Sequence, residues 1–504
     1  MAATESKMAM IPMGDIPALY TERLETDRLC VAHGADRLSW GEMAQRASRR
    51  ASALKALGVA KNDIVALVAP NENAIFEWAF AAWKLGATPS VISERLPMAE
   101  LSAILDVAKP TAVFAADAAI QGATGARPMD YGLREGDDQP IPSIVGDHWK
   151  AMASGGSSGR PKMIVDMGRG EVDPDTVLLN LPTGGTVLNP GPLCHNAPFT
   201  FMSMALHRGN SVISMKRFDA EEALRLIDIA SVTWTNFVPT MMNRIWSLPA
   251  DIRSRYDISS LDAVWHTAAP MPAWLKEAWI DWLGPEKVWE IYGGTERQGN
   301  TVISGTDWTT HRGSVGRPIN CDIRIIAENG EQLGPGEIGE IYLLPDSGAS
   351  STYHYLGADA PRSANGYETI GDFGWLDDDG FLYIADRRAD LIIRGGMNIY
   401  PAEIENALAE HPDVDGAVVI GLPHRDLGAM VHAIVNPVVG VATPLETEEL
   451  DLFLSTRLAK YKLPGTYEFT DEPLRDEAGK VRRSQLRDER MKMTSATETS
   501  GVGA

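Results

Sequence analysis

Cysteine is scarce in this chain of 504 residues, and long apolar runs are absent. The three cysteines, Cys30, Cys194 and Cys321, lie far apart without metal-ligand spacing, which excludes a disulfide framework and favours a reducing compartment. No stretch of about 18 uninterrupted apolar residues occurs, so we expect no membrane span. Residues 1–12 hold no sustained apolar segment either, and we therefore expect no signal peptide and a cytoplasmic protein.

Positive charge is also in deficit. The chain has 46 Lys and Arg residues against 68 Asp and Glu, which gives a formal net charge of −22. Such a surface disfavours binding to nucleic acids and to anionic membranes, although it allows a local basic pocket. The composition, 44% hydrophobic and 23% charged, is that of a globular protein. The length predicts two or more domains.

The chain contains no Walker phosphate loop, but a different glycine-rich loop is present at residues 154–162, SGGSSGRPK. Pro161 separates Gly159 from Lys162, so the Walker spacing fails. Glycines let backbone N–H groups converge on an anion, the serines add donors, and Lys162 adds a positive charge. This combination predicts a polyphosphate-binding loop.

Two other interpretations of this loop stay open at this point. Residues 155–159 satisfy the G-x-S-x-G pattern of a hydrolase nucleophile elbow with Ser157, but that elbow requires a helix directly after the serine. Here Pro161 and the apolar run Met163–Val165 predict strand, loop, strand instead. A flexible Gly/Ser linker is the second interpretation.

Strands and helices alternate in the first part of the chain. Residues 64–68 and 91–92 and residues 111–115 read as buried strands, and the segments 73–85 and 99–108 between them have helical spacing. This alternation predicts an α/β fold with parallel sheets covered by helices. Residues 330–383 instead predict an antiparallel β region. After Asp390, a helix at 403–409, a strand at 416–420 and a helix at 447–458 predict a small α+β unit.

The loop at 154–162 resembles the phosphate-loop signature of the adenylate-forming superfamily, which comprises acyl-CoA synthetases, luciferases and adenylation domains. Five further segments resemble the other signatures of this superfamily in the same order, so that the resemblance covers nearly the whole chain: His266–Pro270, Tyr292–Glu296, Thr369–Asp372, Asp386–Asp390 with Arg394–Glu405, and Gly479–Arg483.

The resemblance implies a large N-terminal domain at residues 1–386, a hinge at 387–390, a small mobile C-terminal domain at 391–490 and a tail at 491–504. We expect the tail to be disordered because it is rich in Ser, Thr, Gly and Ala. The family pivot within the hinge is usually Asp or Lys, whereas this chain has Ala389, which puts the details of domain rotation in doubt.

An ATP site follows from the same resemblance. Tyr292 would stack on adenine, Asp372 would accept hydrogen bonds from the ribose hydroxyls, and Thr295 would bond the α-phosphate. Glu296 would ligate Mg²⁺, and Lys480 would bridge the acid's carboxylate and the α-phosphate. The residues implied to bind ATP are Ser154, Gly155, Gly156, Ser157, Ser158, Gly159, Lys162, Ala268, Ala269, Tyr292, Gly293, Thr295, Asp372, Arg387 and Lys480.

The remaining implied residues concern the acid and coenzyme A. The segment 191–199 with His195 resembles the family's pocket gate, and residues 236–241 resemble the next pocket wall. The residues implied to line the acid pocket are His195, Asn196, Phe199, Phe237 and Gly294, with His195 also counted as catalytic. Gly395 and Gly396 match the glycines of the tunnel for the pantetheine arm of coenzyme A.

The reaction implied is AMP-forming ligation of a carboxylic acid to coenzyme A. Residues 274–287 and 311–318 resemble the bile acid–CoA ligase branch, which implies a bulky, ring-bearing acid of the steroid side-chain, aryl-alkanoic or aromatic type. The resemblance also allows a homodimer. Three alternatives stay open: transfer of the acyl group to a carrier thiol or an amine, a non-catalytic nucleotide-binding scaffold, and a hydrolase.

Overall fold

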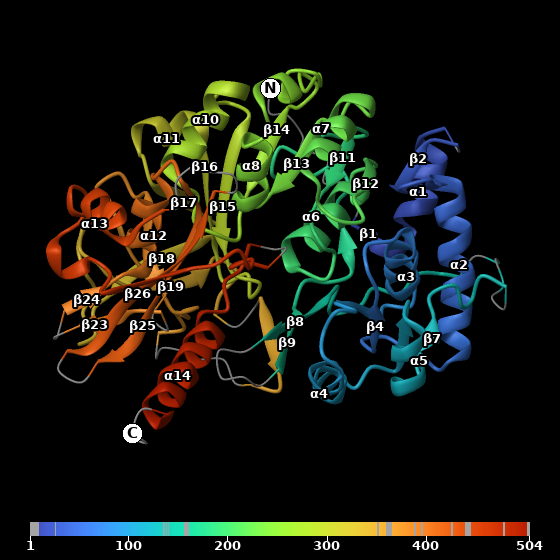
Figure 1. Cartoon of the computed structure of the whole chain (residues 1–504). Coiled ribbons are helices and arrows are strands. Elements are labelled where there is room, and N and C mark those ends of the chain that lie inside the picture. Colours follow the sequence, from blue (N-terminus) through green and yellow to red (C-terminus); the bar gives the residue numbers. More distant parts are fainter. Residues whose placement is uncertain are drawn as a thin grey trace.

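The computed structural model describes residues 10–25, 27–134, 137, 139, 141–155, 161–349, 352–358, 365–387, 390–394, 397–424, 427–438, 445–476 and 479–500. Figure 1 shows a large α/β body and a smaller C-terminal unit, drawn in orange and red, beside it. The predicted α/β class with a small α+β domain is thereby confirmed.

The N-terminal part contains a parallel sheet of four strands in the order β5-β4-β6-β7. The expected strand–helix alternation is confirmed here, because helix α3 follows β4 and helix α4 follows β5. Every residue of β5 is buried, including the polar Thr88 and Ser90, as is usual for a strand of a parallel sheet. The bounds are β4 Ile64–Val68, α3 Asn73–Lys84, β5 Thr88–Ile92, α4 Met98–Ala108, β6 Ala112–Ala115, α5 Ala118–Thr124 and β7 Arg127–Pro128.

A second sheet, 13-stranded within the described residues, runs through the large body in the order β18-β19-β21-β22-β17-β16-β15-β14-β13-β11-β12-β2-β3. Strands β15, β14, β13, β11, β12 and β2 are parallel to one another. The other half is antiparallel and contains β16, β17, β22, β21, β19 and β18 in this order. The antiparallel region predicted for residues 330–383 is confirmed at β19 and β21, and the half also includes the earlier strands β16, β17 and β18.

The parallel half and its covering helices have the bounds β2 Leu29–His33, β3 Asp36–Ser39, β11 Thr186–Asn189, α6 Asn196–His207, β12 Ser211–Ser214, α7 Ala220–Ile229, β13 Trp234–Phe237, α8 Pro239–Trp246, α9 Ala250–Arg253, β14 Ala263–His266, α10 Ala273–Leu283 and β15 Val288–Gly293. The antiparallel half comprises β16 Asn300–Ser304, β17 Ser314–Ile319, β18 Cys321–Ile326, β19 Gly339–Pro345, β21 Asp372–Leu376 and β22 Leu382–Arg387, with α11 at Gly305–Thr310.

A small antiparallel sheet, β20-β9-β8, contains the strands that flank the glycine-rich loop. Its bounds are β8 Ala151–Gly155, β9 Pro161–Asp166 and β20 Tyr353–Leu356. The two predicted strands are thus confirmed on either side of residues 156–160, which lie outside the described residues, and the described chain resumes at Pro161 as a strand and not as the helix of a nucleophile elbow. The N-terminal edge of the body adds β1 Ile11–Pro12, α1 Ile16–Arg23, α2 Trp40–Ala56 and β10 Glu171–Val172.

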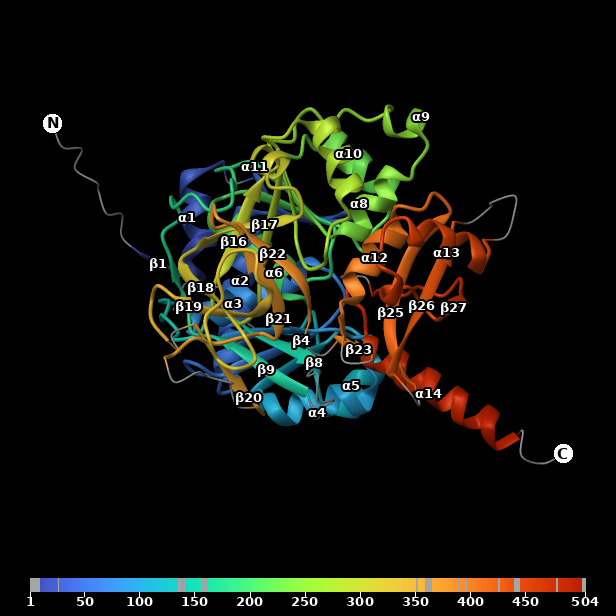
Figure 2. The same ribbon diagram turned by 90° about the vertical axis from the view of Figure 1, so that its left-hand side faces the viewer.

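The C-terminal unit packs α12 and α13 on the sheet β25-β26-β27. Its bounds are β23 Ile392–Arg394, β24 Met397–Ile399, α12 Pro401–Ala409, β25 Val414–His424, β26 Gly428–Pro437, α13 Thr447–Ser455, β27 Thr466–Phe469 and α14 Arg483–Ser500. Helix α14 projects away from the body (Figure 2) and extends into residues 491–504, which we expected to be disordered. Its Met, Lys, Glu and Ala residues favour a helix and explain this difference.

No helix among the described residues combines the length and the apolar character that crossing a bilayer demands.

A buried ion pair joins α2 and α3. The Arg50 guanidinium lies 2.7 Å from the Glu77 carboxylate and 4.4 Å above the Trp78 ring, and both charged side chains are at most 2% exposed. Arg50→Met should lower the free energy of unfolding by about 3–5 kcal/mol, because it leaves a carboxylate buried without its main partner. Chemical denaturation measures this loss.

The double variant Arg50→Met/Glu77→Leu is the control, because it removes the stranded charge together with its partner. It should recover much of the lost stability. If Arg50→Met alone unfolds within about 0.5 kcal/mol of the wild type, the pair does not stabilise the fold.

Candidate functional site

The parallel strands direct four of the predicted site segments to one edge of the large sheet. Neighbouring parallel strands end on the same side, and ligands of α/β sheets bind beyond those carboxyl ends. Strand β11 is followed by the segment of His195, β13 by Val238–Thr240, β14 by Ala268 and Ala269, and β15 by Gly294–Glu296. Residues far apart in the sequence therefore meet at one edge.

The segment of His195 is fixed by a buried asparagine. The Asn71 side chain donates to the carbonyls of Gly191 and Met215, each at 2.9 Å, and accepts from the N–H of Leu193 at 2.8 Å. His195 is half-buried and stands at the N-cap of α6, and Asn196 is the first residue of that helix. Both therefore lie at the carboxyl edge.

Two predicted pocket residues are fully buried. Phe199 packs beside Trp149, at a ring distance of 6.3 Å. Phe237 belongs to a different cluster, beside Trp279 at 5.9 Å. The role expected for these two residues in the acid pocket stays a prediction.

On the nucleotide side, Tyr292 and Asp372 come together from segments 80 residues apart. The Tyr292 hydroxyl donates to Asp372 Oδ2 at 2.7 Å, and Asp372 is only 3% exposed. Ala268 is exposed and adopts the left-handed conformation with φ of +76°, which is unusual for alanine. Ala269 is half-buried beside it, and Gly293, at the end of β15, is exposed.

Glu296 lies at the centre of a small polar cluster. Its Oε1 accepts a hydrogen bond from the Tyr355 hydroxyl at 2.8 Å and lies 3.7 Å from Lys162 Nζ. The Lys162 ammonium also lies 3.8 Å from the centroid of the Tyr355 ring. Burial and the neighbouring Glu296 carboxylate raise the pKa of Tyr355, so its hydroxyl stays protonated and donates. Thr295 is half-buried next to this cluster.

The loop that carries Lys480 reaches the large domain. A Cβ atom added to Gly479 would lie 3.6 Å from Thr240 Oγ1 and from Val238, so this loop packs against the end of β13 and the start of α8. The loop is closed by Asp476, whose Oδ1 accepts from the Lys480 N–H at 2.9 Å. Gly479 itself has φ of +76°, which favours glycine. Lys480 is exposed at this contact.

The base of this loop is held within the C-terminal unit. Arg483 donates to Asp390 at 2.8 Å and to Glu405 at 2.7 Å, and Arg475 lies 3.4 Å from Glu405. These two carboxylates raise the pKa of Arg483 against the opposing effect of burial. The last arginine of the terminal G-K-x-x-R motif is therefore an anchor, which fastens α14 to α12.

Several predicted residues lie outside the described residues: Gly156, Ser157, Ser158 and Gly159 of the glycine-rich loop, Ala389 of the hinge, and Gly395 and Gly396 of the tunnel. For Ser154, Gly155 and Arg387 the structure gives the strand position only, in β8 and at the end of β22. The roles expected for these residues stay predictions.

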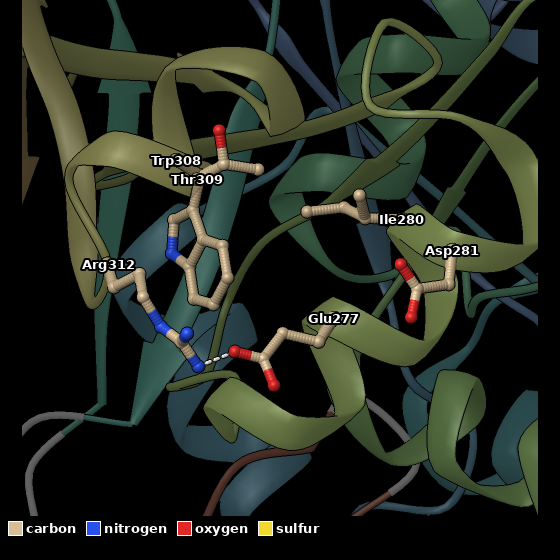
Figure 3. Close-up of a pocket in the computed structure, with 6 residues that line it drawn as sticks. All are labelled: Glu277, Ile280, Asp281, Trp308, Thr309 and Arg312. Carbon is tan, nitrogen blue, oxygen red and sulfur yellow. Dashed lines mark ion pairs between the residues drawn. The ribbon is translucent and has the colours of Figure 1, made fainter.

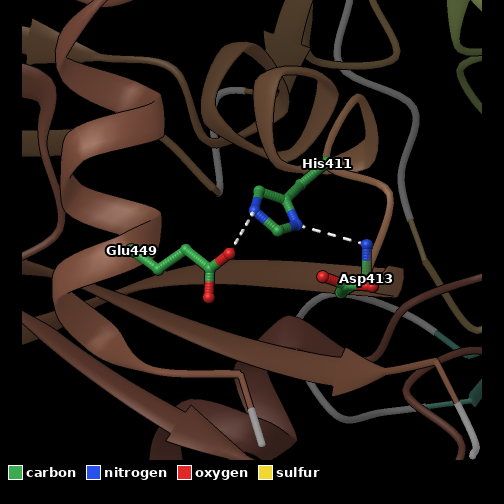
Figure 4. A group of neighbouring side chains, drawn as sticks. All are labelled: His411, Asp413 and Glu449. Carbon is green, nitrogen blue, oxygen red and sulfur yellow. Dashed lines mark hydrogen bonds and ion pairs between the residues drawn. The ribbon is translucent and has the colours of Figure 1, made fainter. Parts of the chain in front are cut away.

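A hydrogen-bonded histidine cluster in the C-terminal unit does not suit a metal. Among the described residues, the one group of three with ligand atoms close together is His411, Asp413 and Glu449 (Figure 4). His411 Nδ1 accepts from the Asp413 backbone N–H at 3.2 Å, which places the proton of a neutral ring on Nε2, 3.7 Å from Glu449. Neither nitrogen then offers a lone pair to an ion.

A small open cavity of about 230 Å³ lies between α10 and α11 (Figure 3). Its lining includes Trp308 and the ion pair of Glu277 with Arg312. It contains none of the residues predicted for the site, so it is separate from the carboxyl edge described above.

Motif matching missed Tyr355, Lys150, Asp166 and Arg297. All four contact predicted residues or their immediate neighbours, yet none lies within the spacing of a signature. The alternating aromatic run Tyr353–Tyr355 is a strand signal. It does not reveal that β20 pairs with β9, because that pairing joins segments far apart in the sequence.

A buried histidine gives a pH test of strand β14. His266 ends β14, and burial lowers its pKa to about 4, with Glu290 and Lys276 as its charged neighbours. Between pH 6.5 and about 4 the unfolded chain binds a proton there that the folded chain does not. Lowering the pH through this window should therefore decrease the free energy of unfolding.

His266→Asn should flatten this decline, by about 3 kcal/mol across the window, in denaturation curves measured at successive pH values. The other buried histidines of the described residues, His207, His411 and His432, stay unchanged in both proteins and cancel in the comparison. Equal pH dependence of variant and wild type would show that His266 is protonated in the folded chain as well.

Comparison with known proteins agrees with this geometry. The AMP-binding enzyme family model matches residues 20–353, and the model of the C-terminal domain of AMP-binding enzymes matches residues 403–480. Feruloyl-CoA synthase of Amycolatopsis sp is 33% identical over 482 residues, which cover 92% of this chain and 96% of that protein. A long-chain-fatty-acid–CoA ligase of Mycobacterium tuberculosis is 30% identical over 483 residues, covering 90% of this chain and 93% of that protein.

Among solved structures, o-succinylbenzoate CoA synthetase of Bacillus subtilis, in complex with its acyl-adenylate intermediate, superimposes with a TM-score of 0.79 at 25% identity. The match covers 95% of this chain and 99% of that chain. The chain therefore belongs to the AMP-binding enzyme family, within the adenylate-forming superfamily whose motifs it carries, on the branch of the acid–CoA ligases.

Proposed function

We propose that this enzyme joins a ring-bearing carboxylic acid, of the aromatic or aryl-alkanoic class, to coenzyme A through an acyl-adenylate. The observation that carries the proposal is the convergence of three segments at one sheet edge. These are the segment of His195, the loop of Thr295 and Glu296, and the loop of Lys480 against Val238 and Thr240. Acid, α-phosphate and a lysine can meet there.

In the first step, the acid's carboxylate oxygen attacks the α-phosphorus of ATP and pyrophosphate leaves. Two anions approach each other, so the step needs fixed positive charge and donors at the phosphates. Lys480 is suited to bridge carboxylate and α-phosphate, because an ammonium on a flexible stem is a mobile point charge delivered by the small domain. Thr295 adds a hydroxyl donor on the opposite side.

Tyr292 and Asp372 are suited to hold the nucleoside. The ring of Tyr292 would stack on adenine next to the backbone of Ala268 and Ala269. Its hydroxyl already bonds Asp372, so one interaction fixes the ring and the carboxylate together. A carboxylate can accept hydrogen bonds from both ribose hydroxyls. Arg387, which pairs with Asp372 in the β21–β22 ladder, would approach the ribose or the phosphates.

The residues present fit a Mg²⁺ ion that enters with ATP. Mg²⁺ commonly takes one or two carboxylates together with substrate phosphates, and Glu296 offers a carboxylate with 12% of its side chain exposed. Lys162 lies 3.7 Å from Glu296 Oε1, and the phosphates would draw Lys162 away from this carboxylate, which would leave its negative charge to the ion. When bound, the ion would neutralise charge on the phosphate oxygens.

In the second step, the thiol of coenzyme A attacks the acyl carbon and AMP leaves. Gly395 and Gly396 would leave room for the pantetheine arm. A carrier-protein thiol or an amine is the alternative acceptor, and the chemistry of the first step is the same for all three. The nucleophile therefore has to be identified by experiment.

The substrate class is argued from resemblance and relatives together. Residues 274–287 and 311–318 resemble ligases of bile acids, and the relatives described above act, by name, on feruloyl, succinylbenzoyl and long-chain fatty acyl groups. Feruloyl and succinylbenzoyl groups are both aromatic, which agrees with the ring-bearing acid that the resemblance implies. Steroid acids remain the finer prediction. The cytoplasm and a homodimer also remain predictions.

One experiment tests the proposal: a panel of aromatic, aryl-alkanoic, steroid and fatty acids incubated with ATP, Mg²⁺ and one acceptor at a time. The acceptors are coenzyme A, a simple amine and a pantetheinylated carrier protein, and mass spectrometry reads the products. We expect an aromatic acyl-CoA with stoichiometric AMP. An amide or an acyl-carrier product would favour the alternative, and ADP as the product would contradict adenylation.

Lys480→Ala tests the lysine directly. Loss of a positioned charge at a developing transition state should slow acid-dependent adenylate formation by about 10²-fold or more. Formation of acyl-CoA from supplied acyl-adenylate should change far less. Single-turnover measurements of the two half-reactions give both rates.

Lys460→Ala is the matched control, because Lys460 is another exposed lysine of the same domain. It should leave both rates unchanged. If Lys480→Ala slowed the two half-reactions equally, Lys480 would serve the structure of the small domain and not adenylation.

A further inference from the structure

Beyond the residues that touch substrates in the proposed function, one charged network connects both walls of the site, with two buried members and a third, Arg297, whose side chain is 46% exposed. It consists of Lys150, Asp166 and Arg297, which none of the family signatures includes. Lys150 immediately precedes β8 and Asp166 ends β9, so both belong to the hairpin that carries the phosphate loop. The Lys150 and Asp166 side chains are 1% and 2% exposed.

At one end, the network holds the loop of Glu296. Arg297 directly follows Glu296 and has φ of +54°, a left-handed conformation that is uncommon for a residue with a long side chain. Its Nη1 donates to Asp166 Oδ1 at 2.7 Å, and the same oxygen accepts from the Gly168 N–H at 2.8 Å. The buried carboxylate thus compensates for the strained backbone next to Glu296.

At the other end, the network holds the first turn of α6. Lys150 Nζ donates to Thr200 Oγ1 at 2.7 Å and to Asn196 Oδ1, and it lies 3.8 Å from Asp166 Oδ2. Asn196 is the first residue of α6, next to His195. The acid-pocket helix and the loop of Glu296 therefore contact the same ion pair from opposite sides.

This arrangement is relevant to catalysis because adenylation depends on the distance between the two reacting groups. The acid's carboxylate must lie within about 3.5 Å of the α-phosphorus, and a displacement of about 1 Å is costly. A fully buried ion pair with several hydrogen bonds holds its neighbours in one geometry far better than exposed side chains do. Because both walls of the site bond to this ion pair, the pair sets the distance between them.

We propose that Lys150, Asp166 and Arg297 are positioning residues that fix the loop of Glu296 relative to the acid-pocket helix. The proposal rests on the proposed function, because it assigns Glu296 to MgATP and the start of α6 to the acid. Arg297 acts on nucleotide binding through Glu296. Lys150 acts on the alignment of two substrates that are each already bound.

Substitutions of Arg297 distinguish the effect of its ion pair with Asp166 from the effect of its left-handed backbone conformation. Binding of the Mg²⁺ complex of α,β-methylene-ATP, which cannot be cleaved at the reacting bond, is measured by calorimetry without acid. Arg297→Gly keeps the left-handed conformation and removes the pair, so affinity should fall about fivefold to tenfold. Arg297→Lys should restore it to within about twofold. If Arg297→Gly bound the analogue with wild-type affinity, the role proposed for the Arg297 side chain would be overturned, since the backbone conformation alone would be sufficient for binding.

Substitution of Lys150 should change the rate of adenylation and leave the affinity for the nucleotide nearly unchanged. Lys150→Met should slow acid-dependent AMP formation about tenfold at saturating acid and MgATP, with affinity for the analogue within about twofold of wild type. Thr200→Val, which removes one of the two hydrogen bonds from Lys150 to α6, should slow the rate in the same direction by a smaller factor, and it keeps the test intact if Lys150→Met fails to fold. Unchanged rates in both variants would overturn the proposal.

The control is Arg50→Met/Glu77→Leu, which replaces another fully buried ion pair that contacts none of the predicted site residues. It should shift the melting temperature without changing either the rate or the affinity. A wild-type enzyme that forms no AMP with any acid of the panel would refute the proposed function. A wild type that forms AMP, with variants that match it, would refute this inference alone.

Discussion

The parallel alignment of β11, β13, β14 and β15 is the constraint on which the site depends. Parallel strands place their carboxyl ends on one side, so the segments of His195, Thr240, Ala268 and Glu296 meet without being close in sequence. The buried, apolar strands hold this alignment, since a shift of register would expose core side chains. The packing of the hydrophobic core therefore determines that these four segments lie at this edge.

Buried polar pairs then add what the parallel strands cannot supply. The antiparallel half brings Asp372 to Tyr292, and the small sheet brings Tyr355 and Lys162 to Glu296. In each case a charged or polar group is partnered before any ligand binds, which keeps its burial from being costly.

The sequence predicted local structure and motif identity well, and side-chain surroundings poorly. Helix α3 begins at Asn73, as periodicity predicted, and the strands β8 and β9 flank the glycine-rich segment. Tyr355 and Asp166 could not be predicted, because the β9–β20 pairing joins them across about 190 residues of chain. The motif that contains Phe199 did not reveal that its side chain is fully buried beside Trp149. Residue spacing identifies a segment, whereas the contacts of its side chains depend on packing between segments that are far apart in the sequence.

The central claim is that a carboxylate attacks the α-phosphorus of ATP at this edge, with the loop of Lys480 already against Thr240. Transfer of isotope from acid to nucleotide measures that bond formation directly. With an accepted acid labelled by ¹⁸O in its carboxyl group, and coenzyme A present, the account predicts one labelled oxygen in AMP and none in pyrophosphate. Unlabelled AMP, or label in inorganic phosphate with ADP as the other product, would contradict the account.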